Sequence, residues 1–466
     1  MPASAVSSLQ VLAEWWAAAG LPVESLNQVQ LTGADPVLPS SFHVGTAAQV
    51  SIAAAALAAC ELAQVRGAPR QMLSVDMLAA AQECTGWFSV DGVVPPKWDP
   101  FSGLYRCADG WVRIHANFAH HRDGALRLLG LAPETAQPAD VTAALQDWRA
   151  EAFETAAAEQ RLVVAALRDF ATWDLHPQAL ALKTQPLWTL ERIGDAPPLS
   201  LPALPAEARP LHGVRVLDLT RILAGPVGGR TLAAYGADVM LVNAPHLPNI
   251  ASIAETSRGK RSVLADLRSL AGRADFAALL QGSHVMLQGY RPGGLQDLGF
   301  GPEQAAAQRP GIVYVSLSAY GEHGPWCQRR GFDSLVQTAT GFNQAEGLAA
   351  GQAGPKALPV QILDYASGFF MAAAAAVALR RQQLEGGSWL VRLSLAQTAQ
   401  WLRQLGRVEA GFATAETAIT PWLESLDSGF GRLQAVRHAA QLSRTPVGWL
   451  RPSVPPGSDA PHWIDG

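Results

Sequence analysis

Short apolar runs alternate with helical segments through the second half of the chain. The run 214–219 reads as a buried strand, and a glycine-rich turn at 223–229 is expected to precede a helix at 230–235. Further strands are predicted at 238–242, 262–264, 284–287 and 311–318. Strands that alternate with helices favour a parallel, doubly wound α/β sheet, which binds its ligand at the carboxyl ends of the strands.

The first half is more helical. A proline-rich joint at about 195–210 separates it from the second half, in which strands and helices alternate. Short β segments are predicted at 104–106 and 111–115. A chain of 466 residues is long enough for two or three domains. We therefore predict that residues 1–200 form a degenerate helical repeat plus a smaller α+β domain. Residues 210–466 are predicted to form the Rossmann-like sheet domain and a C-terminal tail.

Composition indicates a cytoplasmic protein. The net charge is −4 at pH 7, and nothing indicates a nucleic-acid partner or a disordered tail. The four cysteines show neither disulfide nor metal spacing, which favours a reducing compartment. No Lys or Arg precedes Arg66, so no signal peptide is predicted. The alanine-rich runs near 50–60 and 370–379 are expected to be too short to cross a bilayer.

Asp364 stands between an extended apolar run at 358–363 and an alanine-rich segment at 369–379. This order predicts a helix N-cap, where backbone N–H groups and the helix dipole would keep the carboxylate ionised at neutral pH. An ionised carboxylate can act as a nucleophile. Asp is also a favoured helix cap everywhere, so the local pattern leaves a plain cap and a catalytic residue both open.

An internal repeat also emerges. Gly45, the alanine run that follows it and residues 72–75 parallel Gly368, its alanine run and residues 392–395. Aligning the two glycines puts Ser41 where Asp364 stands. If the segments are related, the first copy has lost its carboxylate; the other interpretation is chance similarity of two alanine-rich helices.

Several short motifs in the second half resemble one family. They occur in a fixed order at 213–221 (GVRVLDLTR), 224–226 (AGP), 236–239 (GADV), 259–262 (GKRS), 290–293 (YRPG), 298–300 (LGF), 319–321 (AYG), 331–333 (GFD) and 364–368 (DYASG). Together they resemble the class III CoA-transferases, which include formyl-CoA and carnitine CoA-transferases. The resemblance implies that Asp364 is the nucleophile that becomes acylated. It also implies a class III CoA-transferase-like fold and a homodimer.

The first half resembles the same family in a displaced order. Residues 101–106 and 109–112 are similar to the segment that opens the family's small domain, and residues 442–446 to its C-terminal end. In the usual order the small-domain segment follows the catalytic helix. The chain therefore looks permuted or fused.

The resemblance also implies contacts with CoA. The implied residues are Leu223, Ala224, Ala265, Arg268, Gly289, Tyr290, Arg291 and Tyr320. Two positions depart from the family, since Ala244 replaces an arginine and Gly289 an asparagine. We consider Arg221, Arg258 and Lys260 as cations that could compensate.

The reaction implied is transfer of CoA between carboxylic acids through an aspartyl-acyl anhydride and an aspartyl-CoA thioester. Acyl-CoA and a carboxylic acid are the expected substrates, with no metal or other cofactor and no membrane or nucleic-acid partner. A racemase of the same fold is disfavoured, because Phe332 stands where racemases carry a histidine. A nicotinamide dehydrogenase is disfavoured because the turn lacks G-x-G-x-x-G and Asn243 ends the second strand. A non-catalytic CoA-binding remnant is a further alternative.

Other conspicuous side chains are predicted to have structural roles. His43, His120, His121 and His323 lack a partner at recognisable spacing and are expected at the surface or in packing. Trp15 and Trp16 are expected to cover a core from an amphipathic helix.

Overall fold

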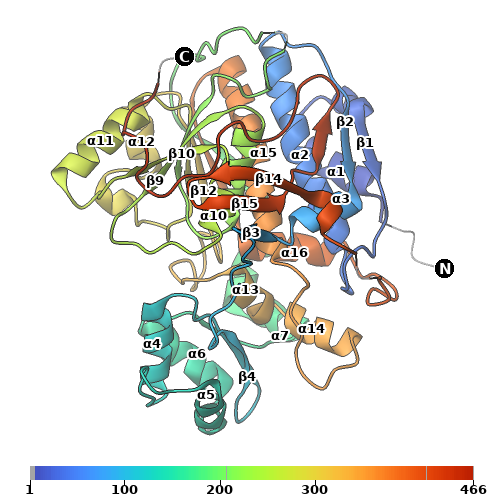
Figure 1. Ribbon diagram of the computed structural model, residues 1–466, viewed down its shortest axis with the longest axis vertical. Helices are drawn as coiled ribbons and strands as arrows, with labels where there is room; N and C mark the ends of the chain where they lie inside the picture. The colour runs from blue at the N-terminus through green and yellow to red at the C-terminus, as the bar shows by residue number, and fades with distance from the viewer. Residues whose placement is uncertain (1–5, 206, 416, 465–466) are drawn as a thin grey trace.

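A seven-stranded sheet forms the centre of the molecule (Figure 1). The computed structural model describes residues 6–205, 207–415 and 417–464. The strand order is β10-β9-β8-β11-β12-β13-β7. The strands are β8 Arg215–Leu219, β9 Asp238–Asn243, β10 Lys260–Leu264, β11 Val285–Gln288, β12 Val313–Ser318, β13 Ser388–Ser394 and β7 Trp188–Gly194. Only β7 runs antiparallel, along β13. The predicted parallel sheet is confirmed, and each expected strand lies within two residues of its observed start.

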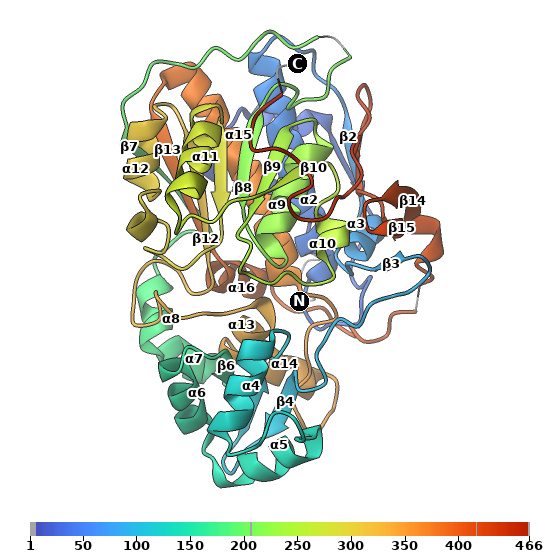
Figure 2. The same cartoon turned by 60° about the vertical axis from the view of Figure 1, so that its left-hand side comes forward.

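Helices cover both faces of this sheet (Figure 2). One face packs against α9 (Ala224–Ala234) and α15 (Ile362–Glu385), and α2 (Val44–Val65) packs on α15 in the same large core. The other face packs against α11 (Leu270–Gln281) and α12 (Pro302–Gln308) in a second core. This two-sided cover is the doubly wound arrangement that continuous apolar strands require.

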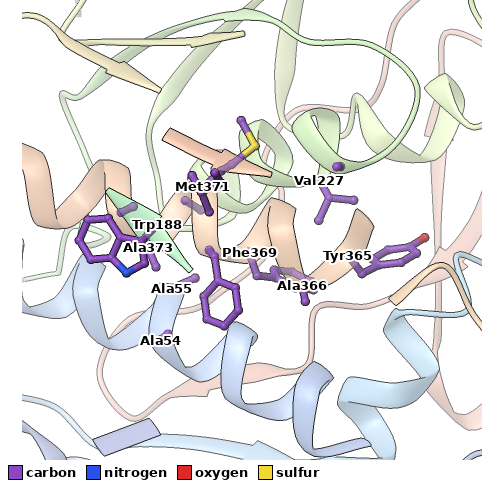
Figure 3. Packing of buried hydrophobic residues seen from close by; sticks show 14 of the residues in the cluster. Ala54, Ala55, Trp188, Val227, Tyr365, Ala366, Phe369, Met371 and Ala373 are labelled. Atoms are coloured by element: carbon purple, nitrogen blue, oxygen red, sulfur yellow. The ribbon is translucent and has the colours of Figure 1, made fainter. Parts of the chain in front are cut away.

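The two alanine-rich helices α2 and α15 lie against each other in the larger core. Figure 3 shows Ala54 and Ala55 of α2 facing Ala366, Phe369 and Ala373 of α15. Small side chains let the two helices approach closely, which accounts for the alanine content.

These helices are 22 and 24 residues long, so the expectation that they are too short to cross a bilayer is wrong about their length. By length and composition alone, both are apolar enough to cross a membrane. Within the protein, however, 94% and 100% of their most apolar windows are buried. Packing in a protein core therefore accounts for their apolar character.

The glycine-rich segment after β8 is helical, which corrects the predicted turn: α9 begins at Ala224 rather than near residue 230. Its glycines serve close packing. A Cβ on Gly228 would lie 3.0 Å from the Gly368 carbonyl oxygen, and one on Gly368 would lie 2.3 Å from that of Ala224. Two glycines thus let α9 and α15 cross at backbone distance.

The smaller α+β region forms the lower lobe in Figures 1 and 2 and has its own hydrophobic core. Its antiparallel sheet comprises β4 (Gly103–Arg106), β5 (Trp111–Ile114) and β6 (Val164–Ala166). Helices α4 (Ala119–Leu128), α5 (Pro138–Ala144) and α6 (Ala150–Glu159) cover it. The predicted pairing of a large parallel sheet with a smaller α+β unit is therefore confirmed.

The C-terminal tail pairs with the first half of the chain. Strand β16 (Ala440–Leu442) joins β1 (Val29–Thr32) and β2 (Leu73–Asp76), while β14 (Leu423–Ser428) and β15 (Gly431–Val436) join β3 (Phe88–Val90). The remaining helices are α1 Ser8–Ala18, α3 Met77–Glu83, α7 Phe170–Leu175, α8 Pro177–Leu182, α10 Ile253–Thr256, α13 Asp333–Ala339, α14 Phe342–Ala349 and α16 Leu395–Gln404. Short 3-10 helices lie at Val23–Gln28, Leu145–Asp147, Gln296–Leu298 and Thr420–Trp422.

Contacts in space cross the proline-rich joint. Strand β7 precedes the joint yet forms an edge of the large sheet, and α1 and α2 share the core of α15. Trp15 and Trp16 are buried in that core, as predicted. The division into residues 1–200 and residues 210–466 stays a prediction.

Candidate active site

A cavity of about 370 Å³ opens at the carboxyl ends of β8, β11 and β12. The loops after these strands line it, together with the first turns of α9 and α16. Asp364 contributes from the start of α15, and Phe118 from the small α+β region. The cavity therefore lies at the edge of the sheet where parallel α/β folds bind ligands.

Asp364 is the third residue of α15, not its N-cap. The N-cap is Gln361, whose side chain makes no capping hydrogen bond. The backbone N–H of Asp364 donates to Asp333 Oδ2 at 2.9 Å. Within the described part of the chain, no hydrogen bond reaches the Asp364 carboxylate, which is 8% exposed and lines the cavity. The predicted capping role is therefore wrong, because Asp333 receives the helix N–H group instead.

Burial raises the pKa of Asp364 well above its usual range, and the negative charge of Asp333 raises it further. Burial also raises the pKa of Asp333, to about 7, against hydrogen bonds from the Asp364 backbone and the Gln337 side chain. The expectation that the helix start keeps Asp364 ionised is therefore wrong in direction. Desolvation of two adjacent carboxylates outweighs the helix dipole, and the pair retains a proton more readily than isolated carboxyls do.

Asp333 is held by a chain of buried side chains. Its Oδ1 accepts a short hydrogen bond from Gln337 Nε2. Gln337 Oε1 in turn accepts from Asn343 Nδ2 at 3.1 Å and from the Leu358 backbone at 3.0 Å. The sequence placed Asp333 in the motif at 331–333 without giving it a role. Its proximity to Asp364 is visible only once α13 and α15 pack together.

Five of the residues implied as CoA contacts line the cavity with Asp364: Leu223, Ala224, Gly289, Tyr290 and Arg291. Three others lie outside its lining. Ala265 is buried just beyond β10, and Arg268 is exposed and forms two 2.9 Å hydrogen bonds with Asp266. Tyr320 is 2% exposed and packs edge-on against Trp326, and burial raises its pKa to about 12. CoA contact stays a prediction for all eight.

Of the three cations considered as substitutes for the missing arginine, only Arg221 lines the cavity. Arg258 is fully buried in ion pairs with Glu255 and Glu424. Lys260 is buried 2.8 Å from Asp218 Oδ2. Both buried cations have neutralising partners, so the idea that they serve a CoA phosphate is wrong.

The small region supplies cavity residues that the sequence did not single out for catalysis. His121 is 6% exposed and, with the exposed His120, lines the cavity beside Phe332. The prediction that His121 has a surface or packing role therefore omitted its place in the cavity lining. Its place depends on how the small region docks onto the sheet, which no local pattern encodes. His43, which was expected to lack a partner, lies 3.2 Å from Asp35.

The start of α2 can be compared with that of α15. Asp35 accepts hydrogen bonds from the backbone N–H groups of Gly45 and Thr46, at 3.0 Å each, and from Thr46 Oγ1 at 2.7 Å. Thr46 is the third residue of α2, as Asp364 is of α15. Ser41 instead precedes α2 and donates its N–H to Glu346 at 2.8 Å. Counted from the first helical residue, Thr46 and not Ser41 matches Asp364, and the repeat itself stays a prediction.

Comparison with known proteins identifies the middle of the chain. Residues 211–420 match the family described as CoA-transferase family III. A probable fatty acyl-CoA transferase of Mycobacterium tuberculosis, Rv3272, is 33% identical over 210 residues, which is 42% of this chain and 53% of that protein. Succinate–glutarate CoA-transferase of Agrobacterium fabrum is 30% identical over 211 residues, covering 41% of this chain and 52% of the relative.

Formyl-CoA:oxalate CoA-transferase of Streptomyces coelicolor is 30% identical over 200 residues, or 40% of this chain and 48% of the relative. The crystal structure of Rv3272 aligns with a TM-score of 0.39 at 32% identity, over 42% of this chain and 58% of that one. The chain thus spans about half the length of the curated relatives it matches.

Proposed function

We propose, from the match of residues 211–420 to CoA-transferase family III, that the protein moves CoA between carboxylic acids with Asp364 as nucleophile. One observation carries the assignment of the nucleophile. The Asp364 carboxylate borders the cavity, receives no hydrogen bond from the described residues and lies among the loops expected to hold CoA. A buried carboxylate without stabilising donors is poorly solvated and hence more reactive when ionised.

The proposed reaction conserves atoms and charge at each step. The Asp364 carboxylate attacks the thioester carbonyl of the donor, forms a mixed anhydride and releases CoA thiolate. The thiolate attacks the aspartyl carbonyl, giving an aspartyl-CoA thioester and the free donor acid. The acceptor carboxylate attacks this thioester, and the released thiolate then attacks the acceptor acyl carbonyl. Acceptor acyl-CoA leaves, and Asp364 is regenerated.

The surroundings support this chemistry in two ways. The first turn of α9 brings the backbone of Ala224 and Gly225 to the cavity, where N–H groups not used within the helix can stabilise a tetrahedral oxyanion. Asp333 holds the Asp364 backbone at 2.9 Å, so the nucleophile is fixed without its own oxygens being occupied. The charge of Asp333 also disfavours the ionised resting carboxylate, which makes bond formation at Asp364 more favourable.

A racemase of the same fold is the second candidate function, because a histidine, His121, lines the cavity. Phe332 cannot take an α-proton, but His121 lines the same cavity. Burial, with the nearby charges of His120, Arg330 and Arg221, lowers the pKa of His121 to about 3. Such an imidazole is a weak base at neutral pH, so transfer is the better supported reaction.

The remaining parts of the proposal follow from the transferase assignment. Acyl-CoA and a carboxylic acid are the substrates, and acyl exchange at a carboxylate calls for no further cofactor. We also propose a cytoplasmic homodimer without nucleic-acid or membrane partners. Two thiols, Cys84 and Cys107, are buried, which suits a reducing compartment.

The decisive experiment is incubation with a panel of acyl-CoAs, followed by peptide mass measurement. An acyl or CoA adduct on Asp364 is expected, and it should be absent from Asp364→Asn. Transfer of CoA to an added acid without any adduct on Asp364 would refute the covalent mechanism. CoA binding without transfer to any acid would instead favour the non-catalytic alternative.

A second experiment separates transferase from racemase. A 2-methylacyl-CoA incubated in heavy water should gain no α-deuterium, because transfer never breaks the α-C–H bond. Enzyme-dependent deuterium uptake that is lost in His121→Phe would establish the racemase instead.

A further inference from the structure

The hydrogen-bond donors around the pair of carboxyls, Asp333 and Asp364, are directed at Asp333. The backbone N–H of Asp364 donates to Asp333 Oδ2 at 2.9 Å, and the Gln337 side chain donates to Oδ1. The N–H of Leu363 is a further donor to the same carboxyl. The Asp364 carboxyl receives no hydrogen bond from the described residues. A carboxyl with donors at both oxygens is favoured as the anion, whereas one without donors loses little by keeping a proton.

The Gln337 amide is fixed in the orientation that donates to Asp333. Its Oε1 accepts the backbone N–H of Leu358 at 3.0 Å, and a backbone N–H group can only donate. Asn343 Nδ2 donates to the same oxygen at 3.1 Å. Nε2, at the other side of the amide, therefore faces Asp333 as a donor. Because an amide does not titrate, this donor favours the Asp333 anion at every pH.

A buried cation of the small α+β region, Arg113 of β5, acts on the same carboxyl. Arg113 is 7% exposed, forms no ion pair with a carboxylate of the described residues and lies 4.9 Å from the centre of the Trp98 ring. Burial lowers its pKa to about 10, so it stays protonated at neutral pH. Its charge lowers the pKa of Asp333, whereas the charge that acts on Asp364 is that of Asp333. The docked small region therefore favours a negative charge on Asp333 over one on Asp364.

Other titratable groups around the pair do not reverse this preference. His115 of the small region lies 3.4 Å from Ser334 Oγ, and burial lowers the pKa of its ring to about 3, so it is neutral. Tyr365 follows Asp364 and stays protonated, because burial raises its pKa. The cations in the cavity lining are not among the charges that shift the pKa of Asp364; they are Arg221, Arg291, Arg329 and Arg330.

We propose that, when the pair holds one proton, Gln337 and Arg113 keep Asp333 as the anion and place the proton on Asp364, so that the nucleophile rests as an uncharged carboxylic acid. Gln337 and Arg113 are then positioning residues, because they act through Asp333 and neither lines the cavity. The proposal rests on the proposed function, since it concerns the resting form of the same nucleophile.

The resting acid has to lose its proton before it can attack. Asp364 borders the cavity, so its O–H bond can break by transfer of the proton to water there. The electron pair left on the oxygen then forms the bond to the thioester carbonyl carbon, and CoA thiolate leaves with the electrons of the C–S bond. Since Asp333 is already an anion, this ionisation places two negative charges side by side. The reactive form therefore becomes abundant only at alkaline pH.

The kinetic test compares kcat/KM at about pH 7.5 with kcat/KM at about pH 9.5. Gln337→Leu removes a donor from Asp333, so the proton moves to Asp333 more often and leaves Asp364 ionised. The ratio of the lower-pH value to the higher-pH value should rise roughly three- to tenfold, even if both values are reduced. A purely structural role of Gln337 would reduce both values together and leave the ratio unchanged.

Arg113→Met should raise the same ratio, because it removes the cation that favours the Asp333 anion. Arg113→Lys keeps the charge and should give a ratio near that of the wild type. Thr340→Val is the matched control: Thr340 is buried just after α13, and its hydroxyl donates to the Val336 carbonyl at 2.7 Å. It should leave the ratio unchanged. An unchanged ratio in folded Gln337→Leu or Arg113→Met would overturn the proposal.

Esterification by a diazo ester locates the proton without any turnover. A protonated carboxyl gives its proton to the diazo carbon, and the carboxylate oxygen then displaces N₂ to form an ester. Peptide mass spectrometry should find the ester on Asp364, at a rate that stays level through about pH 7 and falls only where kcat/KM rises. A rate that falls as the pH passes about 7, where Asp333 titrates, would place the single proton on Asp333 and overturn the proposal.

These readouts separate the proton assignment from the proposed function. A protein that moves no CoA, but whose Asp364 is esterified at an unchanged rate through about pH 7, would refute the proposed function and support the proton assignment. A protein that moves CoA, but whose esterification rate falls in that range, would refute the assignment and leave the transferase function in place.

Discussion

Helices α2 and α15 lie side by side, and at the start of each an aspartate accepts a backbone N–H group. The two first turns differ in the side chain at the third helical position. At α2 the carboxylate of Asp35 receives N–H groups from the second and third helical residues. At α15 Asp333 receives the N–H of the third residue. The third residue is Thr46 in α2, whose hydroxyl donates to Asp35, and Asp364 in α15, whose carboxylate meets a second carboxylate.

An aspartate that accepts N–H groups at a helix start therefore has a different effect in each helix. At α2 every donor meets an acceptor, so the arrangement stabilises the fold. At α15 the Asp364 carboxylate has no hydrogen-bond donor among the described residues and has a like-charged neighbour, so it lowers stability while supplying a reactive group.

Asp364→Asn should reduce transfer roughly a thousandfold or more, because the nucleophile of the proposed reaction is removed. It should not lower the unfolding free energy at pH 8, since it also removes repulsion from Asp333. Steady-state kinetics and denaturant unfolding measure both effects. Thr46→Val is the matched control in α2 and should cost about 1 kcal/mol while leaving transfer intact.

Asp35→Ala should lower the unfolding free energy by about 2–3 kcal/mol, because several buried donors lose their acceptor. Chemical denaturation of the purified protein gives this value. If Asp35→Ala and Asp364→Ala destabilise equally, the contrast between the two helix starts is incorrect.

Asp333→Asn should move the acid limb of the kcat/KM profile to lower pH, since it removes a negative charge that raises the pKa of Asp364. The amide oxygen can still accept the Asp364 N–H group. An acid limb that stays in place or moves to higher pH would show that Asp333 does not set the titration of the nucleophile.

The same variant should change how stability depends on pH. Burial raises the pKa of Asp333 from 3.8 to about 7, so the folded protein binds more protons than the unfolded chain between these values. The unfolding free energy should therefore fall as pH rises through that window, and Asp333→Asn should flatten the fall. Thermal denaturation at several pH values measures the slope.

Ser41→Ala should have the smallest effect, a loss of about 1 kcal/mol in stability with transfer unchanged. Ser41 donates both its N–H and its hydroxyl to Glu346 but does not line the cavity. A large loss of transfer would mean that the start of α2 takes part in the reaction after all.

The sequence predicted those parts of the fold that local patterns determine. Strands such as β8 and β12 are continuous apolar runs bounded by turn residues, so their type and order could be recognised. The turn predicted at 223–229 was wrong, because glycines in this segment allow two helices to pack closely and do not form a turn. Strands β14 and β15 were not predicted, since β14 has no buried position and β15 pairs with β3, which is distant in the sequence.

The candidate site was predictable in position but not in electrostatics. The family resemblance pointed to Asp364 and to five residues that line its cavity. The pKa of Asp364 is raised first by burial and then by the charge of Asp333, and the two carboxylates meet only when α13 packs on α15. His121 was missed for the same reason, because the docking of the small region decides what its ring faces.

The packing of α2 on α15 has a consequence for biosynthesis. Helix α2 ends at Val65 and its main partner begins only at Ile362, so the ribosome releases one apolar helix long before the other exists. Until then the nascent chain carries an apolar surface that only the last third of the sequence can cover. Premature termination before α15 should thus yield a fragment prone to aggregate, and productive folding has to wait until α15 has been made.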